Sequence, residues 1–169
     1  MGEKLKILMN VDDTNQAFLR EANSLDLSNL RRWKNANRNF FFHKDEITEA
    51  QQLAWFNSYL TRAQDYMLIV LVNDQPIGCM GIRFLENEWD VYNVILGEIR
   101  YEKKGFMSKA FQVMLKFASS TNNNPITLKV LENNPAVIWY QKQGFEIITK
   151  IKNHYQMVFK TQNKKENLI

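Results

Sequence analysis

The feature that most constrains the fold is an uninterrupted apolar run, YMLIVLV, at residues 66–72. A strand this uniformly apolar is typical of a sheet covered on both faces, because an exposed face would place polar residues at every second position. The turn signal NDQP follows, and the apolar run at 77–85 predicts a hairpin partner. Further strand patterns lie at 16–22 and 89–96. The chain must therefore supply helices for two faces of one sheet.

Two helices are predicted before this hairpin. The first is capped by Asp26 or Ser28 and runs to about residue 37. The second opens with the capping box of Thr48 and Gln51 and runs to about residue 62. Its apolar spacing predicts that it buries Leu53, Phe56 and Leu60.

The second half of the chain continues the alternation. Gly105 precedes a helix with a regular apolar stripe, which predicts one buried face. A strand at 126–131 leads to a short helix with Pro135 in its first turn and Gly144 at its end. Two closing strands form a hairpin. The stripe consists of Met107, Ala110, Phe111, Met114, Leu115 and Ala118.

The element order is β-α-α-β-β-β-α-β-α-β-β, with a further short strand at 4–9. This order predicts an α/β (α+β) fold with one mixed sheet of six to seven strands and about four helices. The length of 169 residues fits a single domain over the whole chain. We expect residues 161–169 to form a flexible tail.

Composition excludes several functional classes. The chain lacks the roughly 18–20 consecutive apolar residues of a membrane span, and its start lacks a signal-peptide pattern. Cys79 is its single cysteine, so no intrachain disulfide is expected and a cytoplasmic location is favoured. No Cys/His ligand spacing is present, so no metal site is predicted. The net charge of +4 is spread along the chain, which predicts no nucleic-acid stripe but suits an anionic ligand.

The stretch YEKKGFMSKA at 101–110 points to such a ligand. It takes the chain from a strand through a basic, glycine-containing turn into a helix. Free backbone N–H groups and the positive end of the helix dipole together form an anion site. Gly105 permits close backbone approach, and Lys103, Lys104 and Lys109 add positive charge. By itself, the stretch also fits a solvated basic turn.

The segment VLENNPAVIWYQKQGF at 130–145 makes the anion site more specific. Asn133, Ala136 and Tyr140, followed by Gly-Phe, resemble the second motif of the GNAT superfamily of acyl-CoA-dependent N-acyltransferases. Gly105 matches the central glycine of that family's pyrophosphate-binding turn. Glu102 departs from the usual Arg or Gln, and Met107 from the usual Gly or Ala. The resemblance extends over roughly residues 17–160 and includes the element order.

The resemblance implies an N-acetyltransferase that uses acetyl-CoA. In such an enzyme Tyr140 would protonate the leaving thiolate, and Asn133 would cap the following helix and bond the cofactor. Tyr140 also fits a half-buried helix aromatic. The cofactor-binding residues that the resemblance implies are Ile95, Leu96, Gly97, Lys103, Lys104, Gly105, Phe106, Met107, Ser108, Lys109, Asn133 and Tyr140.

The acceptor amine must lose a proton, and a carboxylate can accept it directly or through water. Glu98 is the favoured residue because it ends the strand before the phosphate turn, and Asp90 and Glu132 remain alternatives. The oxyanion formed during transfer needs N–H donors. Backbone amides between Val94 and Gly97 are predicted to supply them.

The acceptor is expected in the first half of the chain, because the cofactor elements occupy the second. Residues 30–48 and 51–56 are dense in Arg, Asn, Trp and His and resemble GNAT enzymes that acetylate nucleotide-linked amino sugars. Plain packing also explains the helical spacing of Trp33, Trp55 and Phe56. The predicted substrate-binding residues are Trp33, Asn35, Arg38, His43 and Asn93.

Two other functions remain open. One is acetylation of a protein N-terminus, a ribosomal protein or a small amine. The other is a non-catalytic module that binds acyl-CoA, which Glu102 keeps under consideration. The resemblance also leaves a homodimer open.

Overall fold

The computed structural model describes residues 8–160, so the predicted tail at 161–169 lies outside the described residues. Its centre is one mixed sheet of eight strands in the order β1-β2-β3-β4-β5-β6-β8-β7. All neighbouring strands are antiparallel except the parallel pair β5 and β6. The prediction of six to seven strands was therefore one or two too low. The short strand expected at 4–9 lies partly outside the described residues, and β1, at Leu8–Asp12, pairs with β2 as the edge of the sheet. The strands are Leu8–Asp12 (β1), Ala17–Glu21 (β2), Asp65–Val72 (β3), Gln75–Leu85 (β4), Glu88–Leu96 (β5), Ile126–Leu131 (β6), Phe145–Ile151 (β7) and His154–Phe159 (β8).

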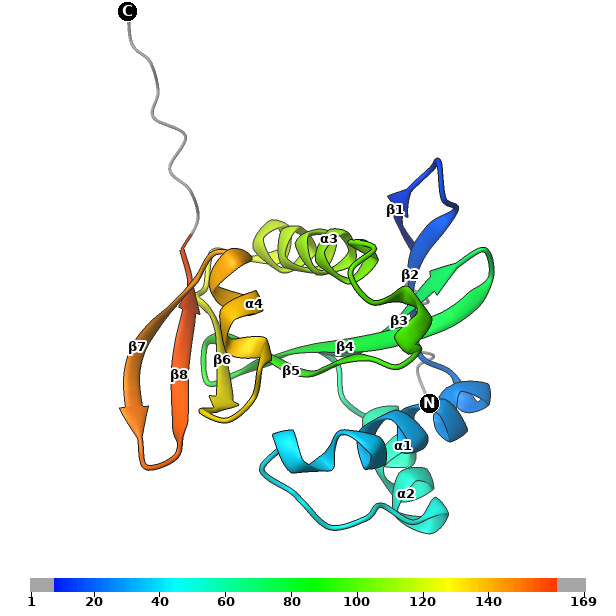
Figure 1. Cartoon of the computed structure of the whole chain (residues 1–169), viewed down its shortest axis with the longest axis horizontal. Helices are drawn as coiled ribbons and strands as arrows, with labels where there is room; N and C mark the ends of the chain where they lie inside the picture. The colour runs from blue at the N-terminus through cyan, green and yellow to red at the C-terminus, as the bar shows by residue number, and fades with distance from the viewer. Residues whose placement is uncertain (1–7, 161–169) are drawn as a thin grey trace, which may run out of the picture.

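Helices cover both faces of the sheet, as the apolar run at 66–72 requires. α3 and α4 lie on one face, and α1 and α2 lie on the other (Figure 1). Short 3-10 turns join some of these elements, at Ser24–Asp26 (η1), Arg38–Phe40 (η2) and Ile99–Tyr101 (η3). The helices are Leu27–Ala36 (α1), Glu49–Tyr59 (α2), Phe106–Thr121 (α3) and Ala136–Lys142 (α4).

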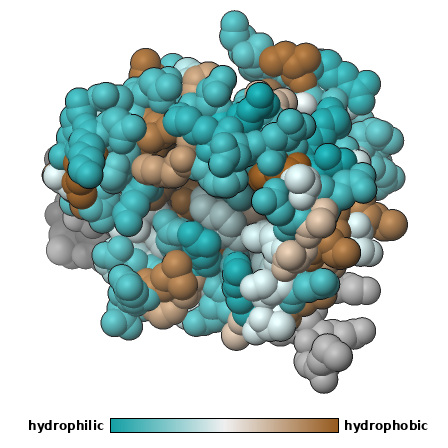
Figure 2. All heavy atoms as spheres, turned by 90° about the horizontal axis from the view of Figure 1, so that it is seen from below, coloured by the Kyte–Doolittle hydropathy of each residue, from teal (hydrophilic) through white to brown (hydrophobic). Residues whose placement is uncertain are grey.

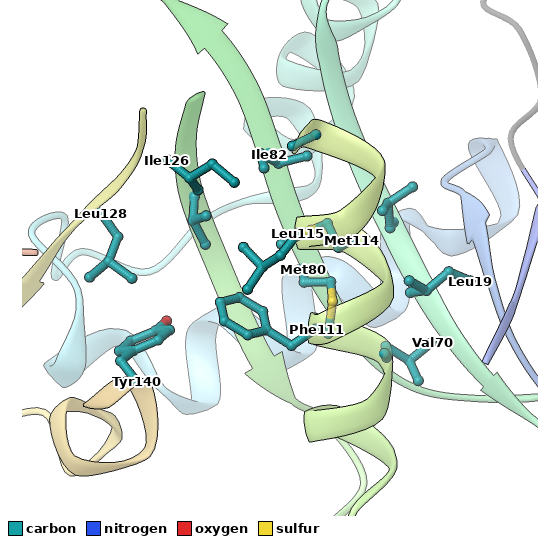
Figure 3. Close-up of a cluster of buried hydrophobic side chains, with 14 of the residues drawn as sticks. Leu19, Val70, Met80, Ile82, Phe111, Met114, Leu115, Ile126, Leu128 and Tyr140 are labelled. Atoms are coloured by element: carbon teal, nitrogen blue, oxygen red, sulfur yellow. The ribbon is translucent and has the colours of Figure 1, made fainter. Parts of the chain in front are cut away.

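The larger core lies between the sheet and α3. Phe111, Met114 and Leu115 point from the predicted stripe of α3 onto strands β3, β4 and β6 (Figure 3). Each of these three side chains is at most 1% exposed, so their burial stabilises the fold by roughly 1.5–3 kcal/mol per side chain. Tyr140 closes the α4 end of this core. The predicted stripe of α3 is confirmed, with Met107 only partly buried.

The prediction for α2 was only partly right. The capping box of Thr48 and Gln51 is present, but the helix ends at Tyr59 rather than near residue 62. Leu53 and Leu60 are about half exposed, at 52% and 46%. The buried face instead consists of Gln52, Phe56 and Tyr59, because the Tyr59 hydroxyl donates to the Glu21 carboxylate and accepts the Met67 N–H.

Strands β5 and β6 pair over a short distance and then separate. Their parallel ladder joins Trp89–Val91 to Ile126–Leu128. Farther along β5, Gly81 faces Tyr92 while Cys79 faces Ile95, so β5 carries one extra residue. This is a β-bulge, and Asn93 adopts a φ of +48° within it. The bulge and the separation open the middle of the sheet.

Within residues 8–160, no helix is long and apolar enough to cross a membrane. Figure 2 looks from below at the side on which α1 and α2 lie. Hydrophilic atoms dominate this face, and its apolar atoms form separate patches rather than one continuous surface.

Candidate active site

Three adjoining cavities surround the bulge of β5. The first, here called the helix-start cavity, has a volume of about 620 Å³. It lies between β5, the start of α3 and the start of α4, and Phe40 and Phe41 form its far wall. Neither phenylalanine was predicted at the site, although three consecutive phenylalanines in a polar stretch are an available sequence signal. The other residues used below that line it are Ile95, Leu96, Glu102, Lys103, Gly105, Met107, Ser108, Asn134, Ala136 and Trp139.

Backbone amides converge at one end of this cavity. Gly105 is the N-cap of α3 with a φ of +82°, and no side chain caps the helix. The first intrahelical bond runs from the Lys109 N–H to the Gly105 carbonyl. The amides of Phe106, Met107 and Ser108 therefore have no intrahelical partner and carry the positive end of the helix dipole. The predicted helix start is confirmed, and its chemistry suits phosphate oxygens.

The predicted basic residues differ in what they can contribute. Lys103 lines the cavity, whereas Lys104 does not. Lys109 forms an ion pair with Asp12 at 2.6 Å, which lowers the pKa of that carboxyl to about 2. Phe106 packs its ring on Tyr101 rather than lining the cavity. Backbone amides thus provide most of the anion chemistry here.

Ser108 connects α3 to α4. Its hydroxyl oxygen accepts hydrogen bonds from Trp139 Nε1 at 3.0 Å and Gln143 Nε2 at 3.2 Å. With both lone pairs used, the Ser108 proton is free to be donated into the cavity. The bond also fixes Trp139 as a wall, a role that the sequence pattern did not reveal.

Pro135 is the N-cap residue of α4, and the first helical N–H is accepted by Asn134, not by Asn133 as predicted. The Asn134 side-chain oxygen accepts the Ala136 N–H at 2.9 Å, and its amide donates to the Phe40 carbonyl at 3.4 Å. Asn133 is exposed and lines none of the three cavities. The Asx-type turn that precedes Pro135 selects the second asparagine of the pair.

Tyr140 lines the second cavity, here called the open cavity, which has a volume of about 880 Å³. The Tyr140 side chain is 7% exposed, and burial raises the pKa of its hydroxyl. Within residues 8–160 no group hydrogen-bonds this hydroxyl. A buried phenol that stays protonated and faces a cavity can donate a proton to a leaving group.

The three predicted carboxylates occupy different places. Asp90 lines the open cavity, where burial raises its pKa although Arg83 Nε donates to it at 2.9 Å. Glu98 lines none of the three cavities. The Glu98 carboxylate is bound by the Arg32 guanidinium at 2.6 Å and accepts the Trp33 side-chain N–H. Both contacts lower the pKa of Glu98, which makes it a weaker base. Glu132 pairs with Lys150 at 2.5 Å and lines no cavity either.

The third cavity, here called the bulge cavity, has a volume of about 270 Å³ and lies between α1, α2 and the bulge. The Lys34 ammonium lines it, donates to the Asn93 side-chain oxygen and lies 3.3 Å from the centre of the Phe41 ring. The Asn93 carbonyl accepts a hydrogen bond from the Cys79 thiol at 3.3 Å. Lys34 was not predicted at the site.

Of the five predicted substrate-binding residues, the structure brings two to the cavities. His43 and Asn93 line both the bulge cavity and the open cavity. Trp33 is 1% exposed and belongs to the core, which corrects its predicted role. The Asn35 side chain exchanges hydrogen bonds with the Ile47 backbone, at 2.8 and 3.0 Å, and so anchors the loop. Arg38 is exposed and donates to the Asn35 carbonyl.

The β5 backbone after the bulge splits into two parts. Ile95 and Leu96 line the helix-start cavity. Gly97 does not, and its N–H donates to the Ile77 carbonyl at 2.8 Å. A Cβ at Gly97 would lie 2.1 Å from the Trp33 ring, so this glycine permits close packing. An N–H donor for an oxyanion is therefore expected before Gly97.

Comparisons with known proteins agree with this geometry. The sequence profile of the acetyltransferase (GNAT) domain matches residues 16–146. No curated protein matches the chain in sequence.

Solved structures share the fold at low identity. A ribosomal L7/L12 alpha-N-protein acetyltransferase, RimL, in complex with coenzyme A is 12% identical, with a TM-score of 0.75 over 90% of this chain and 96% of that chain. FdhC, a nucleotide-linked sugar GNAT, is 20% identical, with a TM-score of 0.72 over 86% of each chain. A spermidine N-acetyltransferase from Vibrio cholerae, bound to coenzyme A and spermine, is 20% identical, with a TM-score of 0.72 over 85% of this chain and 95% of that chain.

Proposed function

Because this chain belongs to the GNAT acetyltransferase family and is an acetyl-CoA-dependent N-acetyltransferase, we propose that its acceptor is the amine of a nucleotide-linked amino sugar. The resemblance of its first half to sugar-acetylating GNAT enzymes supports this acceptor, as does the fold shared with a nucleotide-linked sugar GNAT.

The helix-start cavity fits the coenzyme. The amides of Phe106, Met107 and Ser108 would bind the diphosphate, with Lys103 as a nearby charge. Bound acetyl-CoA supplies an activated thioester carbonyl. Ile95 and Leu96 on one side and Ala136 on the other would guide the pantetheine arm toward the gap between β5 and β6. Glu102 also lines this cavity, so its carboxylate is expected to face outward when a diphosphate is bound.

The two proton transfers of the reaction are proposed to take place in the open cavity. Tyr140 would donate its hydroxyl proton to the leaving thiolate, and the amine would lose its proton to Asp90 directly or through water. Asp90 now replaces Glu98 as the proposed base, because Glu98 is held outside the cavities. The raised pKa of Asp90 is the direction that improves proton acceptance near neutral pH.

The observation that carries the acceptor proposal is that the bulge cavity and the open cavity adjoin. Lys34, His43, Trp55 and Asn93 line both of them. Together they exceed the space that a simple amine needs, and Trp55 offers an aromatic face for a sugar or base.

The test is acetyl-CoA turnover, followed by release of free thiol, against a matched acceptor panel. The panel contains nucleotide-linked amino sugars, the same sugars without the nucleotide, peptides with free N-termini, and spermidine. We expect kcat/KM to be highest for a nucleotide-linked amino sugar. Equal or higher values for a peptide or for spermidine would refute the proposed acceptor while leaving the acetyltransferase activity intact.

A further inference from the structure

Two polar side chains of the bulge cavity are placed to meet a ligand. One is the Gln52 carboxamide, which lines the cavity although Gln52 is only 8% exposed. No hydrogen bond to this carboxamide is formed by the described residues. No fully buried side-chain nitrogen or oxygen among the described residues lacks a hydrogen-bond partner, so the amide atoms of Gln52 are accessible from the cavity. The carboxamide is therefore available to hydrogen-bond a group that enters the cavity.

The neighbouring residue provides an internal comparison. The Gln51 carboxamide accepts the Thr48 N–H at 2.9 Å and completes the capping box. Gln51 and Gln52 both line the cavity, but the carboxamide of Gln51 is engaged in the capping box of α2. Capping of α2 does not explain Gln52.

The second side chain is Lys34. Burial lowers its pKa to about 8, because removal of water penalises the ammonium. No carboxylate among residues 8–160 pairs with it, and no Asp or Glu lines the bulge cavity. The Asn93 oxygen and the Phe41 ring offset this penalty only in part. A buried cation without a counter-ion is costly to keep, and an anionic ligand would remove that cost.

We propose that the bulge cavity is the subsite for an anionic oxygen group of the acceptor, a phosphate or a carboxylate, bound by the Lys34 ammonium and the Gln52 carboxamide. This inference rests on the proposed function, because it concerns the acceptor of the same site. At about 270 Å³ the cavity is smaller than the pockets that hold whole ligands, so it takes one group of the acceptor. The rest of the acceptor extends into the open cavity through the shared wall of His43, Trp55 and Asn93.

The charge distribution gives the subsite a direction. The open cavity is lined by the carboxylates of Glu86, Glu88 and Asp90 and also by the cations Lys34, Arg83 and Lys129, with Arg83 paired to Asp90, whereas no carboxylate lines the bulge cavity. Carboxylates that could face an amine therefore lie in the open cavity. An acceptor with an amine at one end and an anionic group at the other would be oriented by this contrast. A polyamine would instead place a positive charge against Lys34.

The test measures anion binding and needs no turnover. Coenzyme A is present at saturation, so that the amides at the start of α3 are occupied. The probes are inorganic phosphate, acetate and uridine diphosphate, and titration calorimetry gives their dissociation constants. The test variants are Lys34→Met, Lys34→Arg and Gln52→Glu. Lys44→Met removes a loop lysine that lines no cavity, and Asn57→Asp adds a charge on the exposed side of α2.

A charge-assisted hydrogen bond predicts that Lys34→Met and Gln52→Glu weaken anion binding by about 10- to 100-fold. Lys34→Arg is expected to stay within about threefold of the native chain, as are both controls, since each keeps the subsite charge. Tighter Lys34-dependent binding of phosphate and uridine diphosphate would identify a phosphate, and tighter binding of acetate a carboxylate. Dissociation constants that stay unchanged in both Lys34→Met and Gln52→Glu would overturn the proposal.

A direct readout is the NMR signal of the Lys34 side-chain methylene next to nitrogen, assigned with Lys34→Met. Its titration midpoint should rise when a bound anion is present, while the Lys44 signal stays fixed. The titration is recorded on the native chain, and an unchanged Lys34 midpoint at probe saturation would contradict the subsite. The other titratable groups that line the two cavities around Lys34 are His43, Cys79, Arg83, Glu86, Glu88, Asp90, Tyr92, Lys129 and Tyr140.

The outcome is separable from that of the acceptor panel. Lys34-dependent anion binding without acetylation of any nucleotide-linked sugar would refute the proposed acceptor and keep the subsite. Acetylation of such a sugar, combined with anion binding that does not depend on Lys34, would support the proposed acceptor and refute the subsite.

Discussion

The two sides of the bulge are built in different ways. On the helix-start side, the groups aimed at a ligand are mainly backbone amides, fixed by Gly105 and the first turn of α3. On the side of the bulge and open cavities, they are side chains from α1, α2, β5 and the loop at 41–47. Backbone amides bind any phosphate, whereas side chains decide which acceptor fits. One small domain can thus hold a common acyl donor and a particular acceptor by separate chemistries.

We expect the greatest loss of activity when Tyr140 is changed, because the Tyr140 proton goes to the thiolate of the coenzyme during transfer to the acceptor. Tyr140→Phe removes the hydroxyl from the open cavity and should lower kcat by about 10²-fold, the lower end for general acid catalysis. The dissociation constant of coenzyme A should not change, because Tyr140 does not line the helix-start cavity. The rate of thiol release at saturating substrate gives kcat, and titration calorimetry gives the dissociation constant of coenzyme A. Tyr155→Phe, a half-buried tyrosine that lines no cavity, is the matched control, and equal losses in both variants would remove Tyr140 from the chemistry.

Next in size is the choice of base on the acceptor side. Asp90→Asn should lower kcat/KM by about tenfold, since water can partly replace a lost base. Because its pKa is raised, the native activity should fall as the pH drops through that pKa, and this step should vanish in Asp90→Asn. Glu98→Gln should change kcat/KM less than twofold apart from any loss of stability. A larger loss in Glu98→Gln than in Asp90→Asn would reverse the assignment.

On the helix-start side, Gly105→Ala should weaken coenzyme A binding by about fivefold. An alanine at a φ of +82° costs roughly 1–2 kcal/mol, and its methyl group would project into open space where a phosphate approaches. Gly144→Ala is the matched control, since Gly144 also has a positive φ, of +105°, but lies at the end of α4. Calorimetry should detect weaker coenzyme binding in the first variant alone, although thermal melting should show that both are less stable.

The smallest expected effect concerns the cost of the buried lysine. Lys34→Met should raise the free energy of unfolding at pH 7 by about 0.5–1 kcal/mol, after allowance for the lost Phe41 and Asn93 contacts. The folded-state pKa of about 8 lies below the unfolded value of 10.5, so the native chain gains stability as the pH rises between these values. The advantage of the variant should therefore shrink across this window. Denaturant unfolding at pH 7 and pH 10 measures it, and a constant difference would mean that Lys34 is not desolvated.

The same contrast explains what the sequence could predict. The helix start at Gly105 and the stripe of α3 follow from local rules, and both are confirmed. Two predictions fell one residue away: Trp33 was named where Lys34 lines the bulge cavity, and Asn133 was named where Asn134 lines the helix-start cavity. In α1, adjacent residues point about 100° apart, so the packing against the sheet decides which one faces a cavity. Ahead of α4, the hydrogen bond from the Ala136 N–H decides which asparagine is used. Asn93 was predicted to bind the substrate and it lines two cavities, but the bulge that holds it was not predicted, and its contact with Lys34 joins segments far apart in the sequence.

In the proposed complex, coenzyme A lies with its diphosphate on the amides of α3 and its sulfur toward Tyr140. A crystal structure of the native chain with coenzyme A would show this arrangement. We predict phosphate oxygens about 3 Å from the N–H groups of Phe106, Met107 and Ser108, and the thiol at the gap between β5 and β6. A diphosphate bound away from these amides, or a thiol that cannot reach the Tyr140 hydroxyl, would contradict the account.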